Sequence, residues 1–245
     1  MRLDIITLFP EMFAPLYTSI PARAQKRGQV EIGLIDLRSY GSGRHYQTDD
    51  VPYGGGCGMV IQPEPLGRAI ADAQKHSKSS RVVYLSPQGV PLTQKKVESL
   101  ASGDGHIIMI CGHYEGIDER IIQKYVDEEI SLGDFVISGG ELAAMVLSDA
   151  IIRLIPGVID AQSAENESFS TGILDCPYYT RPPVYEDMPV PEVLTGGDHK
   201  KIDQWRREQA LLSTARKRPD LLKGQKLTKD ELRFLSTAGY DVTNN

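Results

Sequence analysis

The pattern of apolar and polar positions along the chain predicts strands that alternate with helices. Strand-like runs occupy residues 3–8, 30–37, 81–86, 106–111 and, in short pieces, 130–137. Helical patterns occupy residues 65–74, 93–101, 118–125 and 141–154. Thr93 stands where the N-cap of its helix is expected. Strands that alternate with helices favour an α/β fold with a largely parallel sheet.

The pattern changes near residue 160, where a polar stretch begins and is followed by a Pro-rich connector over 176–191. A helical region follows over 198–245, in which Ile202, Trp205 and Leu212 have the spacing of one apolar helix face. We therefore expect three parts: a first domain over 1–160, a flexible linker over 161–175 and a small helical C-terminal domain over 176–245.

Charge is distributed unevenly along the chain. The net charge of the 245 residues is −6, but residues 196–233 contain eleven Lys and Arg against six Asp and Glu. Such a cluster is either a solvated face or a surface that contacts nucleic-acid phosphates. The candidate phosphate-binding side chains are Lys200, Lys201, Arg206, Arg207, Arg216, Lys217 and Arg218.

Cysteine usage and hydropathy indicate the compartment. The three cysteines are widely spaced and form no zinc-ligand pattern, so the sequence predicts no metal site and favours a reduced, cytoplasmic setting. The apolar run at the N-terminus is too short for a signal peptide. No run approaches the roughly 20 apolar residues that cross a membrane, so no membrane partner is expected.

Three glycine-containing turns follow predicted strands, at 85–89, 111–116 and 138–141. Ligands of open α/β sheets bind at the carboxyl ends of the strands, and glycine lets backbone groups approach a flat ring. These turns are therefore either one cofactor site or ordinary connections between strands and helices. The glycines of 54–58 do not fit the dinucleotide-binding or P-loop motifs and are also typical of a surface turn.

Single charged residues leave similar alternatives open. Arg153, among apolar neighbours at the end of a predicted helix, is either a helix-end charge whose stem is buried or a cation placed for chemistry. Glu165, Glu167 and Asp175 lie in or near the predicted linker, where most carboxylates are simply solvated.

Seven segments together carry a resemblance that none of them carries alone. They are LFPEMF at 8–13, DVPYGGG at 50–56, YLSPQG at 84–89, CGHYEGIDER at 111–120, GDFVISGGEL at 133–142, IPGV at 155–158 and YTRP at 179–182. In this order and spacing, the chain resembles the bacterial tRNA (guanine-N1)-methyltransferase family of knotted S-adenosylmethionine-dependent RNA methyltransferases. The resemblance runs nearly from end to end.

The resemblance implies a deep trefoil knot over about 84–140, although knots are nearly absent from other proteins. It also implies an obligate homodimer that methylates N1 of guanosine 37 in tRNA, in an active site that spans both subunits. The residues that match the family's S-adenosylmethionine site are Tyr84, Leu85, Ser86, Pro87, Gly112, Tyr114, Glu115, Leu132, Gly133, Asp134, Phe135, Val136, Ile137, Gly139 and Gly140.

Guanine N1 carries a proton, so its methylation requires a general base and a stabilising group for charge on O6. By the resemblance, Arg153 stabilises O6. Glu167 stands where the family has the Asp that acts as general base, and Asp175 is the alternative carboxylate. The family uses Mg²⁺, for which the sequence shows no dedicated ligand cluster. Two rival functions stay open: another knotted RNA methyltransferase, acting on a ribose 2′-hydroxyl or a different base, and a non-catalytic RNA-binding protein.

Overall fold

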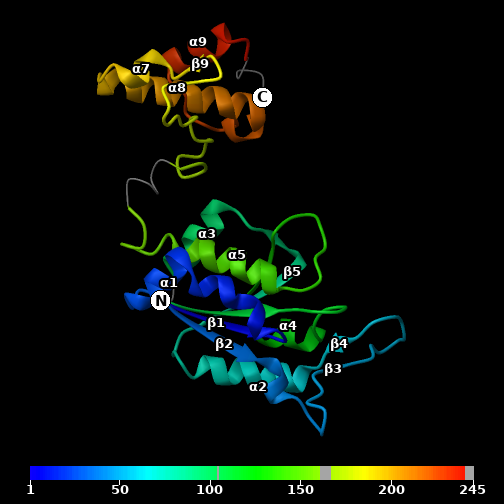
Figure 1. The fold of residues 1–245 in the computed structure, drawn as a ribbon. Helices are drawn as coiled ribbons and strands as arrows, with labels where there is room; N and C mark the ends of the chain where they lie inside the picture. The colour runs from blue at the N-terminus through cyan, green and yellow to red at the C-terminus, as the bar shows by residue number, and fades with distance from the viewer. Residues whose placement is uncertain (104, 161–166, 241–245) are drawn as a thin grey trace. The chain divides into compact units, whose positions relative to one another are not determined.

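The structure is a computed structural model that describes residues 1–103, 105–160 and 167–240 (Figure 1). These residues fall into two compact units, Met1–Ile159 and Asp160–Asn245.

The first unit is built on a five-stranded sheet in the order β2-β1-β6-β5-β7, and every neighbouring pair is parallel. Its strands are β1 (Arg2–Thr7), β2 (Glu31–Asp36), β5 (Arg81–Pro91), β6 (His106–Cys111) and β7 (Glu128–Ser131). This confirms the expected α/β fold with a parallel sheet. β6 follows β5 in the chain but lies between β5 and β1, so the sheet order differs from the chain order.

Helices cover both faces of the sheet (Figure 1). One face packs against α1 (Ser19–Lys26), α3 (Gln94–Ala101), α5 (Glu141–Ile152) and the 3-10 helix η1 (Pro10–Tyr17). The other face packs against α2 (Pro63–Gln74), α4 (Glu119–Tyr125) and the 3-10 helix η2 (Leu37–Tyr40). The side chain of Thr93 accepts a hydrogen bond from the Lys96 backbone, so its predicted N-cap role is confirmed.

The central strand β6 shows why the sequence forms this sheet. All six of its residues are buried, because successive side chains enter opposite layers of the core. Ile107 and Met109 pack with the α5 side, whereas Ile108 and Ile110 pack with the α2 side. A strand buried on both faces is therefore continuously apolar instead of alternating.

Several element bounds differ from the sequence expectation. β5 continues to Pro91 through the predicted turn at 87–89, with a shift in its register against β7 between Leu85 and Val90. Gly89 permits this path because a Cβ there would lie 2.4 Å from the Glu129 carbonyl carbon. β7 ends at Ser131, so 132–137 is not a strand.

The chain also forms elements that the pattern did not predict. These are η1, α1, η2 and the short antiparallel strands β3 (Asp49–Asp50) and β4 (Val60–Ile61). The two strands and η2 are too short for a periodicity to become visible.

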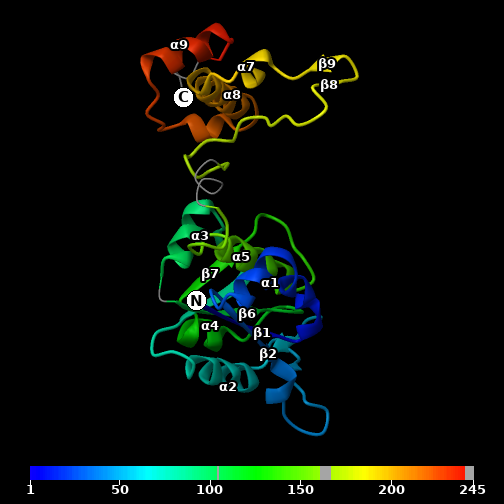
Figure 2. The ribbon, with the colours of Figure 1, turned by 60° about the vertical axis from the view of Figure 1, so that its left-hand side comes forward.

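The second unit is mainly helical, as the sequence predicts. It contains α7 (Glu192–Thr195), α8 (His199–Lys217), η3 (Pro219–Leu222) and α9 (Lys229–Thr237). A hairpin of β8 (Val184–Tyr185) and β9 (Met188–Pro189) extends beside them (Figure 2). On α8, Ile202 is buried as expected, but the small core of the unit forms mainly around Leu211.

The predicted linker over 161–175 falls in two parts. Residues 161–166 lie outside the described residues. Residues 167–175 belong to the second unit, where Ile173 is 2% exposed and packs in the core with Leu211 and Leu235. Within the described ranges, no helix combines the length and the apolar character that crossing a membrane requires.

Candidate functional site

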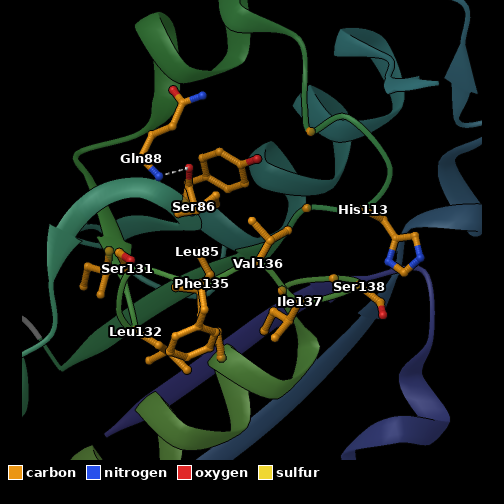
Figure 3. Close-up of a pocket in the computed structure, with 18 of the residues that line it drawn as sticks. Leu85, Ser86, Gln88, His113, Ser131, Leu132, Phe135, Val136, Ile137 and Ser138 are labelled. Atoms are coloured by element: carbon orange, nitrogen blue, oxygen red, sulfur yellow. Dashed lines mark hydrogen bonds between the residues drawn. The ribbon is translucent and has the colours of Figure 1, made fainter. Parts of the chain in front are cut away.

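A pocket in the first unit lies beside the middle of β5 and at the carboxyl ends of β6 and β7. Three segments line it, 84–88, 112–116 and 130–140, together with Ala143 at the start of α5. Figure 3 shows Ser86 and Gln88 at one end of this pocket and His113 and Ser138 at the other. The three strands run parallel, so the middle of β5 and the ends of β6 and β7 place these segments side by side.

The structure brings together fourteen of the fifteen residues that the sequence predicts for cofactor binding. They are Tyr84, Leu85, Ser86, Pro87, Gly112, Tyr114, Glu115, Leu132, Gly133, Phe135, Val136, Ile137, Gly139 and Gly140. The remaining one, Asp134, is exposed and does not line the pocket.

Seven lining residues are not among those fifteen: Gln88, Gly116, Ile130, Ser131, Ala143, His113 and Ser138. Four of them, Gln88, His113, Gly116 and Ser138, stand in the three glycine-containing turns that the sequence offers as one cofactor site. The other three face the pocket only because β7 ends and α5 begins there.

Backbone contacts hold two of the segments close together. The Gly140 N–H donates a hydrogen bond of 2.8 Å to the Gly112 carbonyl, and His113 forms a β-bridge with Gly139. A Cβ on Gly140 would lie 2.7 Å from the Cys111 Cα and 3.0 Å from the Gly112 nitrogen. Glycine is therefore required where these two backbones meet.

The pocket combines a buried phenol with an apolar rim. Burial and the nearby Glu129 carboxylate raise the pKa of Tyr84 to about 12, so its hydroxyl stays protonated at neutral pH. At the rim, Phe135 is 57% and Val136 84% exposed. Adjacent exposed apolar side chains at the rim of a pocket are typical of a surface that a ligand or partner covers.

A buried carboxylate at the start of α5 lies next to the pocket and contacts two neighbouring segments. Glu141, the first residue of α5, is 1% exposed, and its Oε1 accepts a hydrogen bond of 2.8 Å from the Thr7 hydroxyl on β1. Its Oε2 lies 3.8 Å from Nδ1 of His113. A carboxylate at a helix N-terminus is stabilised by the helix dipole, and here it connects β1, α5 and the 112–116 segment.

The three predicted catalytic residues belong to different units. The sequence predicts Arg153 inside a helix over 141–154, but the observed α5 ends at Ile152, so Arg153 is its C-cap residue. Its backbone N–H donates to the Asp149 carbonyl. Glu167 and Asp175 belong to the second unit, where both line a second pocket together with Arg206 and Arg207.

Both carboxylate oxygens of Asp175 accept hydrogen bonds. Oδ1 accepts one of 2.7 Å from the Cys176 backbone, and Oδ2 accepts one of 2.8 Å from the Tyr178 hydroxyl. The bond to Asp175 raises the pKa of Tyr178 to about 12. Asp175 is thus already engaged by donors on both oxygens.

The predicted phosphate-binding side chains lie on α8 and just beyond its end, and all except the half-buried Arg207 are exposed. Four of them pair with carboxylates of the same unit: Lys201 with Asp198, Arg206 with Asp203, Arg207 with Glu231, and Arg218 with Asp220. Among the described residues, Lys200, Arg216 and Lys217 have no carboxylate within ion-pair distance.

Comparison with known proteins identifies the family. The family model described as tRNA (Guanine-1)-methyltransferase TrmD matches residues 1–224. The chain belongs to the tRNA (guanine-N1)-methyltransferase family. The resemblance that the sequence motifs carry is thereby confirmed.

Curated relatives of this methyltransferase agree over nearly the whole chain, and each is named tRNA (guanine-N(1)-)-methyltransferase. The protein of Dechloromonas aromatica is 52% identical over 243 residues, which cover 96% of each chain. That of Halalkalibacterium halodurans is 48% identical over 240 residues, or 97% of each chain. That of Staphylococcus epidermidis is 50% identical over 247 residues, with 100% of both chains covered.

The close approach at Gly140 gives a test of how the pocket of this methyltransferase is held together. We expect Gly140→Ala to lower the free energy of unfolding by about 1–3 kcal/mol, because the added methyl group overlaps backbone atoms that cannot rotate away. Gly67→Ala in α2 is the control, since its Cβ would make only ordinary contacts of 3.6 Å or more. It should raise stability by about 0.5–1 kcal/mol. Equal effects of the two substitutions in urea unfolding would contradict the tight contact.

Proposed function

We propose that the protein transfers a methyl group from S-adenosylmethionine to N1 of guanosine 37 in tRNA, in the cytoplasm. The observation that carries this proposal is the nearly full-length match to curated tRNA (guanine-N(1)-)-methyltransferases at about 50% identity. The pocket at the carboxyl ends of β6 and β7 agrees with it, because that edge is where open α/β sheets bind their ligands.

The pocket residues fit S-adenosylmethionine chemically. Gly112 and Gly140 let the backbone come close to a flat adenine ring, and the exposed side chains of Phe135 and Val136 supply apolar surface. Backbone N–H and C=O groups of 84–88 and 130–140 would form hydrogen bonds with the edges of the adenine ring. When bound, the cofactor supplies a methyl group that its sulfonium already activates.

The knot over about 84–140 is part of the proposal. It rests on family membership, and the order of the central strands supports it. The chain enters β6 from β5, then passes back to the far side of β5 to form β7. The segments 84–88, 112–116 and 130–140 would then be the loops of the knot, held in contact by the bond between Gly140 and Gly112.

We assign the general base to Glu167. N1 of guanine must lose its proton to this carboxylate as the bond from N1 to the methyl carbon forms and the bond from carbon to sulfur breaks. The choice rests on the resemblance, in which Glu167 stands at the position of the family's general base. The oxygens of Asp175 accept hydrogen bonds from the Cys176 backbone and the Tyr178 hydroxyl. Those bonds suit a residue that orients the 167–178 segment.

Arg153 is assigned to the negative charge that builds on O6 of the guanine when N1 loses its proton. A guanidinium keeps its charge at any physiological pH and donates several hydrogen bonds, so it suits that position. Arg153 follows the last turn of α5, whose first residue, Glu141, is anchored to Thr7 beside the pocket. The helix thus connects this cation to the wall of the cofactor site.

The proposed enzyme is a homodimer in which the second unit of one subunit completes the site of the other. Exposed apolar side chains on two packed elements of the first unit support a second copy there: Met12 and Tyr17 on η1, and Leu142 and Val146 on α5. Leu142 and Val146 are four residues apart and so share one helix face. Mg²⁺ enters the proposal as an ion carried by the RNA.

The proposed reaction is tested by incubating the protein with radiolabelled S-adenosylmethionine and two tRNA transcripts that differ only at position 37, G or A. Label should enter the G37 transcript alone, and nucleoside digestion should recover it as 1-methylguanosine. Label in a ribose-methylated nucleoside would indicate a different knotted methyltransferase. Calorimetric binding of tRNA without any binding of S-adenosylmethionine would indicate a non-catalytic protein.

Glu167→Gln and Asp175→Asn distinguish the two candidate bases, since each substitution keeps the shape of the side chain and removes the acceptor of the proton. We expect Glu167→Gln to lower kcat by roughly 10²–10⁴-fold, the usual contribution of a general base. Its affinity for S-adenosylmethionine should be unchanged. Asp175→Asn should have the smaller effect on kcat. The reverse ranking in single-turnover assays would transfer the role to Asp175.

The basic residues of α8 are tested through the salt dependence of tRNA binding. Lys217→Ala should weaken binding and lower the slope of log K against log salt concentration by about 1, because one phosphate contact and its counterion release are lost. The control is Lys95→Ala, which removes an equally exposed lysine from α3 of the first unit. Identical slopes for Lys217→Ala and the unaltered protein would remove Lys217 from the RNA contact.

A further inference from the structure

Two histidines and one aspartate converge at the amino ends of the strands, the edge of the sheet opposite the pocket. Asp4 lies on β1, His106 is the first residue of β6, and His76 follows the C-terminal end of α2. Oδ2 of Asp4 lies 2.8 Å from Nδ1 of His76 and 2.9 Å from Nε2 of His106. All three ligand atoms lie within 4.8 Å of one another.

The parallel register explains why these side chains meet. Arg2 of β1 is paired with His106 of β6, and residues two apart on a strand point to the same face. Asp4 and His106 therefore both face the layer that contains α2, and the end of that helix brings His76 to them. The cofactor pocket uses no residue of this group.

The cluster is buried and incompletely paired. Asp4 is fully buried and His106 is 2% exposed. Within the part of the chain that the structure describes, Oδ1 of Asp4 and Nδ1 of His106 have no hydrogen-bond partner. Buried polar atoms in native proteins nearly always have a partner, so the protein leaves both side chains incompletely bonded. The atoms that face one another within the cluster are the other two, Oδ2 of Asp4 and Nε2 of His106.

We propose that Asp4, His76 and His106 form a binding site for a divalent transition-metal ion of the Zn²⁺ class, separate from the methyl-transfer site. Imidazole nitrogens together with one carboxylate oxygen are donors that suit Zn²⁺, Co²⁺ and Ni²⁺, whereas Mg²⁺ prefers a shell of oxygens. The site is therefore distinct from any Mg²⁺ that accompanies the RNA.

The geometry needs only a small adjustment. In a tetrahedral site with bonds of about 2.0–2.1 Å, neighbouring ligand atoms stand roughly 3.3 Å apart. The present separations of 2.8 and 2.9 Å must widen by about half an ångström as the ion replaces the imidazole protons. The two imidazole nitrogens, which lie within 4.8 Å of each other, must reach the same separation. The His76 side chain is 44% exposed, so it can move and it leaves a path from solvent.

Carboxylates that bind a metal usually also accept a hydrogen bond from a neighbouring residue, and Arg2 provides that hydrogen bond here. Its Nε donates a hydrogen bond of 2.9 Å to Oδ2 of Asp4, and its Nη1 binds Glu31.

The test is a titration of the full-length protein with Co²⁺, followed by its visible absorption, and with Zn²⁺ by calorimetry. All variants carry Cys57→Ser, because Cys57 is an exposed thiol that can bind these ions independently. We expect one ion per chain, an absorption band typical of nitrogen and oxygen ligation, and a melting temperature that rises with Zn²⁺ but not with Mg²⁺.

His76→Ala should weaken binding by at least about tenfold and abolish the Zn²⁺-dependent rise in melting temperature. The matched control is His199→Ala, which removes an exposed histidine at the start of α8 and should leave the affinity unchanged. Asp4→Asn, which keeps the side-chain shape, should also weaken binding.

Two results would overturn the proposal. One is the absence of saturable Co²⁺ binding to the unaltered cluster. The other is an equal loss of affinity in His76→Ala and His199→Ala, which would indicate adventitious binding to surface histidines. Neither result depends on methyl transfer, so both leave the proposed enzymatic function untouched.

Discussion

The burial of the central sheet on both faces is the constraint on which the rest of the first unit depends. β6 is buried along its whole length between a layer of α1, α3 and α5 and a layer of α2 and α4. Polar groups cannot be accommodated along such a strand without partners. The chemistry of this unit is therefore confined to the two edges where the strands begin and end.

At the carboxyl edge, the parallel direction of the strands places three segments around one pocket. These segments combine apolar and aromatic side chains, such as Tyr84 and Phe135, with glycines at 112, 139 and 140, where the main chains approach one another. Glu141 fixes α5 behind this wall through its bond to Thr7. A pocket lined in this way recognises a ligand by shape and by hydrogen bonds to the main chain, with few charged groups.

At the amino edge, the same register places Asp4 and His106 side by side, and the end of α2 adds His76. The two edges thus receive different chemistry from one sheet. The carboxyl edge holds glycine-containing loops that suit a flat organic cofactor, whereas the amino edge holds a compact group of nitrogen and oxygen ligands. The second unit has a separate small core around Leu211 and carries the carboxylates Glu167 and Asp175 with the basic α8.

The sequence by itself determined the alternation of strands and helices, the helical second unit, the family and fourteen of the residues that line the pocket. It could do so because buried strands are continuous apolar runs, and because glycines and capping residues mark where those runs end. It misplaced the ends of β5 and β7, since contacts between strands, such as that of Gly89 with Glu129, decide those bounds. Only the tertiary structure decided that His76 and His106 meet Asp4, from 72 and 102 residues away along the chain. No linear spacing encodes that meeting, because it depends on which strands become neighbours in the sheet.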